Sequence, residues 1–243
     1  MGLALPGLLG IAACSVLPER PYQERREWPL LTRRSGTREP PQDAPTLLIR
    51  SLAAAPGLRE RGLLVLQPDG SVQVGYWDEW AVFPADGVED GLRQWLTDSG
   101  LFNAVLAPGS RSRADLVLEG ELTDFVADPR AGVARAALAI VLLRQSGGAA
   151  TVLFATTLRA TAPLAGTAAA TVAAAQLQAL AGVYAQVEQR LAPVAREEGQ
   201  GSPSVAIPPL LRSGGTLGHS ALDTTREGVL RTTREGALRT TGP

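Results

Sequence analysis

The sequence of 243 residues predicts a single α+β domain at residues 46–193, with two helices packed on one face of a mainly antiparallel sheet. Apolar and polar residues alternate along consecutive segments in the second half of the chain, which is the period of strands that bury one face. Two segments, 84–99 and 167–191, repeat apolar residues at helical spacing. The flanking residues 14–45 and 194–243 follow neither period, so we expect a disordered N-terminal tether and a disordered C-terminal tail.

The first segment has the character of a secretory signal peptide, which we place at residues 1–13. Residues 2–13 contain no charged side chain and end in small residues. Cys14, the only cysteine, follows Ile11-Ala12-Ala13, and this pattern resembles a bacterial lipobox. The resemblance implies cleavage before Cys14 and acylation of its thiol and new amino group, which together anchor a chain at a membrane.

Two observations about Cys14 leave an alternative open. An unpaired cysteine is often a small buried hydrophobe, and the segment before it lacks the basic residue that usually opens a signal. The residue after Cys14 is Ser15 rather than an acidic retention residue. By the usual sorting pattern of lipoproteins, this favours the outer membrane.

Residues 17–45 are expected to be a spacer between the lipid and the domain. They are rich in Pro, Arg, Glu and Gln and show no apolar period. Such a composition buries too little apolar surface to offset the entropy lost on ordering. An ordinary irregular N-terminal arm is the alternative.

The domain opens with a predicted strand and a hairpin. Short apolar runs at residues 46–52 and 63–67, bounded by Pro and Gly, indicate buried strands. Pro68-Asp69-Gly70-Ser71 predicts a turn, because Pro fixes φ and Gly adopts positive φ. Residues 71–75 would then return as the second arm of the hairpin.

Aromatic side chains are concentrated at Tyr76, Trp77 and Trp80. Strand alternation puts Trp77 and Trp80 on opposite faces, so we expect one to fill the core near Trp95 and the other to stay near the surface. Exposed aromatic residues often anchor protein interfaces. Tyr76, Trp77 and Trp80 are therefore the candidate partner-docking residues, and the alternative is that they only cover the sheet edge.

The first helix is expected to open at Pro84 and to end at Ser99-Gly100, with an apolar stripe of Val88, Leu92, Trp95 and Leu96. A strand at residues 101–106 and a loop at residues 107–114 follow.

The strongest strand pattern covers residues 115–126, where Leu116, Leu118 and Leu122 share one face. Phe125 breaks the alternation, so we predict a bulge near Asp124. Residues 134–144 and 151–161 continue the pattern as an antiparallel meander with one solvated side.

The second helix is expected at residues 167–191. The interval 160–187 contains no charge. Alanine is nearly neutral for membrane insertion, however, and glutamines interrupt the run, so we expect packing on the sheet rather than a membrane span. Beyond Pro193 the core pattern stops, and residues 224–231 recur almost unchanged as 232–239. A period of eight is too short for a solenoid, which leaves a disordered tail or a short partner-binding repeat.

Composition excludes several classes of function. The formal net charge of −1, without a basic stripe, gives no basis for nucleic-acid binding. The single histidine, His219, lies in the tail, so we expect no Ser-His-Asp site within the fold. Metal-ligand spacing and phosphate-binding glycine motifs are absent from the sequence, and we expect no metal and no cofactor. Acidic pairs such as Glu119 and Glu121 leave a glycosidase-like site as the enzymatic alternative.

An ordered set of segments carries a family resemblance. The set comprises Gly75-Tyr-Trp-Asp-Glu-Trp80, the helix with Leu92, Leu101-Phe102 after Ser99-Gly100, and residues 116–125. These resemble the ABC-type transport auxiliary lipoprotein family, which includes the lipoprotein of the paraquat-inducible intermembrane transport system. The resemblance runs from about Cys14 to Leu191.

The resemblance implies a non-enzymatic periplasmic domain that is anchored to the outer membrane through Cys14. Its partners would be an MCE-domain protein and, through it, an inner-membrane ABC permease and ATPase that move lipids or solvents. Self-association is left open. The alternative is an envelope lipoprotein that binds its own small ligand or stabilises an unrelated outer-membrane complex.

Overall fold

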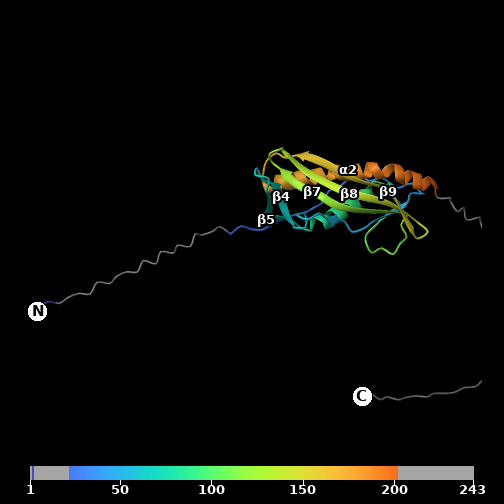
Figure 1. The fold of residues 1–243 in the computed structure, drawn as a ribbon, viewed down its shortest axis with the longest axis horizontal. Coiled ribbons are helices and arrows are strands. Elements are labelled where there is room, and N and C mark those ends of the chain that lie inside the picture. The colour runs from blue at the N-terminus through green and yellow to red at the C-terminus, as the bar shows by residue number, and fades with distance from the viewer. Residues whose placement is uncertain (1, 3–21, 202–243) are drawn as a thin grey trace, which may run out of the picture. The chain divides into compact units, whose positions relative to one another are not determined.

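The computed structural model describes Gly2 and residues 22–201. These residues form one α+β domain, as predicted, in which a mixed sheet packs against two helices (Figure 1). The elements are β1 (Arg26–Trp28), β2 (Thr46–Ile49), β3 (Ala53–Ala54), β4 (Gly62–Leu66), β5 (Val72–Trp80), α1 (Pro84–Asp98), β6 (Ala104–Leu106), β7 (Leu116–Asp128), β8 (Val133–Ser146), β9 (Ala149–Pro163) and α2 (Ala169–Gly201).

Strand β7 is the centre of the sheet. Along one side it pairs antiparallel with β8, which pairs antiparallel with β9. Along its other side it pairs in parallel with β2 at its start, β3 in its middle and β4 at its end. The 13 residues of β7 are long enough to accommodate all three short strands in succession.

The longest pairings, β7–β8 and β8–β9, form the predicted antiparallel meander, and β4–β5 forms the predicted hairpin. The predicted bulge is also confirmed, because the register of β7 against β8 shifts between Leu122 and Asp124. The shift turns Phe125 to the core face, where it is buried with Leu122. The parallel pairings of β7 were not predicted, since they join segments that are far apart in the sequence.

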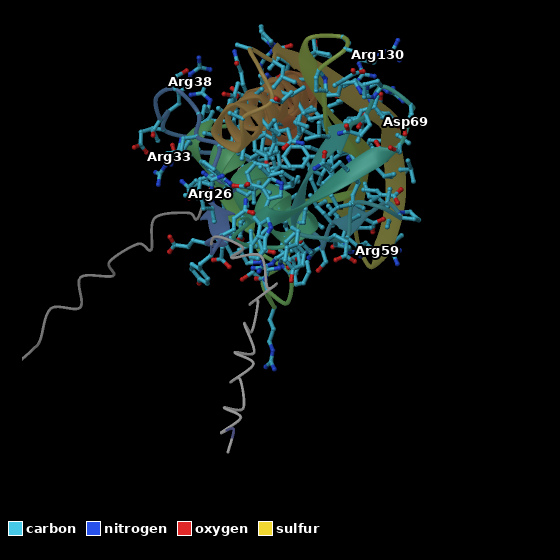
Figure 2. The ribbon with its side chains drawn as sticks, turned by 90° about the vertical axis from the view of Figure 1, so that its left-hand side faces the viewer. Arg26, Arg33, Arg38, Arg59, Asp69 and Arg130 are labelled. Carbon is cyan, nitrogen blue, oxygen red and sulfur yellow. The ribbon has the colours of Figure 1, made fainter. Side chains whose placement is uncertain are left out.

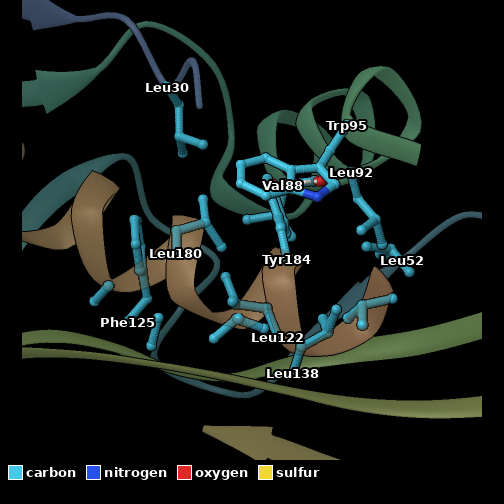
Figure 3. Close-up of a cluster of buried hydrophobic side chains, with 14 of the residues drawn as sticks. Leu30, Leu52, Val88, Leu92, Trp95, Leu122, Phe125, Leu138, Leu180 and Tyr184 are labelled. Atoms are coloured by element: carbon cyan, nitrogen blue, oxygen red, sulfur yellow. Dashed lines mark hydrogen bonds between the residues drawn. The ribbon is translucent and has the colours of Figure 1, made fainter. Parts of the chain in front are cut away.

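Helix α2 packs on β8 and β9, and α1 packs beside it (Figure 3). Tyr184 connects the two helices: its hydroxyl donates to the carbonyl oxygen of Val88 at 2.8 Å, and its ring meets that of Trp95 edge-on at 5.7 Å. Gly91 makes room for this contact, because a Cβ there would lie 2.8 Å from the Tyr184 oxygen. Both predicted helices therefore bury their apolar residues in one common core.

The structure differs from the predicted tether over the last part of residues 14–45. Residues 26–28 form β1, which pairs in parallel with β5. Leu30 is buried against α1, where Gly87 lacks a side chain and leaves room for it. Trp28 also packs against the core. The prediction missed these contacts and the backbone pairing, because neither needs an apolar period in the sequence.

The second helix also continues beyond the predicted limit at Pro193. It runs to Gly201 with Pro193 inside it. Proline removes one helical hydrogen bond, but Leu191 and Ala195 on either side of it are both buried, and Glu198 forms an ion pair with Arg144 of β8. Tertiary contacts thus extend the helix into the first residues of the expected tail. Within the described part of the chain, neither helix has the length and apolarity to cross a membrane.

Candidate docking surface

Strand β5 leaves regular pairing where its aromatic residues lie. Glu79 pairs with Gly62 and Val74 pairs with Leu64, so residues 75–78 together lie opposite Leu63 alone. Extra residues on one strand of a pair bend that strand and redirect its side chains. Tyr76 and Trp77 therefore lie on a bulge of the β4–β5 hairpin.

Two glycines allow the strands to approach at this bulge. A Cβ on Gly62 would lie 2.4 Å from the carbonyl oxygen of Gly75, and a Cβ on Gly75 would lie 2.4 Å from the carbonyl oxygen of Asp78. Side chains at these positions would push the two segments apart. The bulge therefore depends on glycine for space.

The bulge presents an apolar surface to solvent. Tyr76 is 68% exposed, Trp77 is 39% exposed, and their rings meet edge-on at 4.8 Å. Tyr76 also lines an open hollow together with Val74 and Phe83, of which Phe83 is 55% exposed. We call Val74, Tyr76, Trp77 and Phe83 the aromatic patch.

Trp80, the third predicted docking residue, is not part of this surface. It is 1% exposed and stacks on Phe125 at 5.4 Å between ring centres. The prediction that one tryptophan fills the core and the other stays near the surface is confirmed, but Trp80 cannot contact a partner. It also packs on Phe125 rather than near Trp95, whose ring contacts Tyr184.

Strand β1, which pairs with β5, and Arg25 directly before it contact the bulge. The Arg25 guanidinium lies over the Tyr76 ring, 5.4 Å from its centre, and its Nε donates to the Tyr76 carbonyl oxygen at 3.3 Å. Asp78 accepts from Arg26 Nη2 and from Trp28 Nε1, each at 3.2 Å. Sequence reasoning missed Arg25, Arg26 and Trp28, because they lie in the segment expected to be a tether.

The carboxylate behind the hollow is neutralised by arginine. Glu79 is buried and pairs with Arg61, and Arg25 Nε lies 3.4 Å from the same carboxylate. A buried charge is costly unless it is paired. Glu79 therefore fixes the base of the bulge rather than offering a free acid.

Three further acids are bound by neighbouring groups. Glu119 pairs with Arg50 and Asp90 pairs with Arg93, while Glu89 accepts from the Leu52 amide at 3.0 Å. Among the residues that the structure describes, no three His, Cys, Asp or Glu side chains are grouped to hold a metal ion. These three acids have structural partners, whereas Glu121, the other member of the acidic pair, belongs to none of the ion pairs among the described residues.

Three predicted features lie outside the described residues. They are the lipid-attachment site Cys14, the single histidine His219 and the repeat at residues 224–239.

Comparison with known proteins places the fold. The family model described as "ABC-type transport auxiliary lipoprotein component" matches residues 30–188. A crystal structure of a DUF330 protein from Xanthomonas campestris is similar with a TM-score of 0.61 and 26% identity, over 72% of this chain and 99% of that one. An uncharacterized protein of known structure is similar with a TM-score of 0.52 and 14% identity, over 66% of this chain and 99% of that one, and shows the fold alone. Among curated proteins, none matched.

Proposed function

Since the chain belongs to the family of ABC-type transport auxiliary lipoprotein components, we propose that it serves an MCE-type ABC system that moves lipids or solvents between membranes. In this function Cys14 carries the lipid that holds the chain at the outer membrane, with the domain facing the periplasm. The domain is not an enzyme. It binds an MCE-domain protein, which connects it to an inner-membrane permease and ATPase.

The aromatic patch is the observation that supports docking of such a partner. Exposed Trp and Tyr side chains supply much of the binding energy in protein interfaces. Tyr76 and Trp77 are held in place by each other, by Arg25 and by the close approach of Gly62 and Gly75. A surface that is already ordered loses little entropy when it binds.

The position of the patch along the chain also supports this function. Cys14 precedes Arg25 by 11 residues, and Arg25 contacts Tyr76. An extended chain of that length spans at most about 40 Å. A lipid on Cys14 would therefore keep the aromatic patch within roughly that distance of the membrane surface, where a protein that reaches across the periplasm would meet it.

The decisive experiment measures capture of the MCE-domain protein encoded next to this gene. We expect purified parent protein to capture it, and Trp77→Ala and Tyr76→Ala each to weaken binding by about tenfold or more, the loss typical of an interface anchor. Neighbouring genes should also encode a permease and an ATPase.

Val152→Ala is the matched control, because Val152 is an exposed apolar residue on β9, away from the aromatic patch. It should bind like the parent protein. Folded Trp77→Ala and Tyr76→Ala variants that bind as tightly as the control would contradict the docking surface. A gene neighbourhood without permease, ATPase and MCE genes would count against the transport system itself.

A further inference from the structure

A second hollow, separate from the aromatic patch, lies between the β4–β5 hairpin and the start of α2. Its volume is about 510 Å³, which is within the range of small-molecule sites, roughly 300–1,000 Å³. Part of its lining is apolar: Val65 and Leu66 of β4 are half-buried, and the buried Leu63 and Val172 lie beneath them. The hollow can therefore cover the apolar part of a ligand.

The charged lining of this hollow is positive on balance. It contains Arg26, Arg130 and one carboxylate, Asp78. Asp78 is already bound, since Arg26 Nε lies 2.9 Å from its Oδ1 and Trp28 Nε1 donates to the same atom. Arg130 is exposed and belongs to none of the ion pairs among the described residues. Its Nη1 donates to the Pro68 carbonyl oxygen at 3.0 Å. That contact holds the guanidinium at the hairpin turn, on the edge of the hollow.

The first turn of α2 supplies further donors. The first helical hydrogen bond that starts this helix runs from the Val172 amide to the Ala168 carbonyl oxygen at 2.9 Å. Amides before Val172 have no acceptor within the helix, and the first turn contains no acidic side chain. Thr167 and Ala169 line the hollow directly. The positive end of a 33-residue helix thus adds to the charge of Arg130.

Figure 2 faces this end of the domain and labels Arg26 and Arg130, with the hairpin in teal and α2 in orange between them. We propose that this hollow, the headgroup site, binds the phosphate of an anionic amphiphile while its apolar walls cover the adjoining glycerol and first acyl carbons. The choice of a phospholipid among such amphiphiles rests on the proposed lipid-transport function.

The test uses the full chain with Cys14→Ser, so that no lipid of its own competes. The probe is dihexanoylphosphatidylglycerol below its micelle concentration, titrated by calorimetry. We expect saturable binding at one site per chain. Inorganic phosphate and dihexanoylglycerol, which each present half of the ligand chemistry, should bind at least tenfold more weakly.

Two matched pairs of variants locate the site. Thr167→Asp brings a negative charge to the start of α2, where acids stabilise a helix, so it should lower affinity at least fivefold without lowering Tm. Thr167→Asn has nearly the same shape without the charge and should bind like the parent. Arg130→Gln should also lose at least fivefold, whereas Arg111→Gln, which changes an exposed arginine that does not line the hollow, should not.

Affinities that are unchanged in both Thr167→Asp and Arg130→Gln would overturn the headgroup site. Equal affinity for inorganic phosphate would overturn the amphiphile, and equal affinity for dihexanoylglycerol would overturn the role of the phosphate. Because the titration contains no partner protein, its failure is distinct from failure of the capture experiment with Trp77→Ala.

Discussion

Arg34 and Glu188 join the N-terminal arm to helix α2 through a two-pronged ion pair, with Nε–Oε2 at 2.9 Å and Nη2–Oε1 at 3.1 Å. The indole Nε1–H of Trp95, in α1, donates a hydrogen bond to Oε2 of Glu188 at 2.8 Å. Three segments far apart in the sequence thus meet at one carboxylate. Both charged side chains are largely buried, and paired arginine–carboxylate contacts of this geometry are among the stronger ones in proteins.

The pKa of Glu188 sets the direction of a pH test. Burial raises this pKa, but hydrogen bonds from Arg34 and Trp95 and the charges of Arg34 and Arg38 outweigh burial, so the pKa lies below its ordinary value of 4.5. The folded state therefore binds fewer protons than the unfolded chain. The stabilisation is fully present above pH 4.5 and is lost as the pH falls through the lower folded pKa.

We expect Glu188→Gln to destabilise the domain at pH 7 by about 1–3 kcal/mol, the usual cost of losing hydrogen bonds to a charged group. Thermal unfolding across pH 3–8 measures this, at about 2–4 °C for each kcal/mol. The difference in Tm between parent and variant should shrink as the pH falls below 4.5 and through the lower folded pKa of Glu188. A constant difference across the whole range would show that the loss is one of packing rather than of charge. Arg34→Gln in the Glu188→Gln background serves as control and should add little.

The two tryptophans of β5 should respond differently to truncation. Trp80→Ala removes a fully buried ring that stacks on Phe125, so we expect a loss of about 3–5 kcal/mol. Trp77→Ala removes a partly exposed ring from a surface bulge and should cost about 1 kcal/mol or less. Urea unfolding of both variants gives the comparison. If the two losses are equal, Trp77 belongs to the core and the aromatic patch is too small to serve as a docking surface.

Cys14→Ser tests the lipid anchor without touching the domain. The parent should enter the detergent phase on partitioning and should incorporate labelled palmitate, because acyl chains attached at Cys14 supply about 0.8 kcal/mol for each buried methylene. The variant should remain in the aqueous phase or keep its first segment uncleaved, and it should carry no label. Equal membrane retention of both proteins, without label in either, would show that another feature holds the chain at the membrane.

Much of the fold could be predicted because it rests on local patterns. The turn at Asp69 and Gly70, the bulge near Asp124 and the stripe of α1 are each encoded within a few neighbouring residues. What escaped prediction depends on distant partners. The parallel contacts of β7 with β2, β3 and β4 and the pairing of β1 with β5 join segments from about 50 to 70 positions apart.

The candidate site, like the fold, was predicted where it depends on neighbouring residues and missed where it depends on distant ones. Alternation in β5 correctly separated Trp77 from Trp80, but it could not decide which of them is buried, because the choice is made by a bulge opposite Leu63. The contact of Arg25 with Tyr76 could not be predicted, since the two residues lie 51 positions apart in the sequence. The headgroup site could not be predicted either, because its lining residues come from three distant segments: the β4–β5 hairpin, the β7–β8 turn and α2.

Truncation of the C-terminus measures how far the domain extends. A chain that ends after Gly201 should match the parent in Tm, because it keeps all of α2 and loses only residues with a low-complexity, repetitive sequence.

A chain that ends after Arg196 also loses the ion pair of Glu198 with Arg144, whose side chain is 42% exposed. Such pairs contribute about 1 kcal/mol or less, so we expect a fall of no more than about 4 °C. A chain that ends after Ala192 also loses the buried Ala195, so its Tm should be lower still. Scanning calorimetry of the three truncations gives the order, and a loss of more than about 4 °C on ending after Gly201 would mean that residues 202–243 contribute to the folded domain.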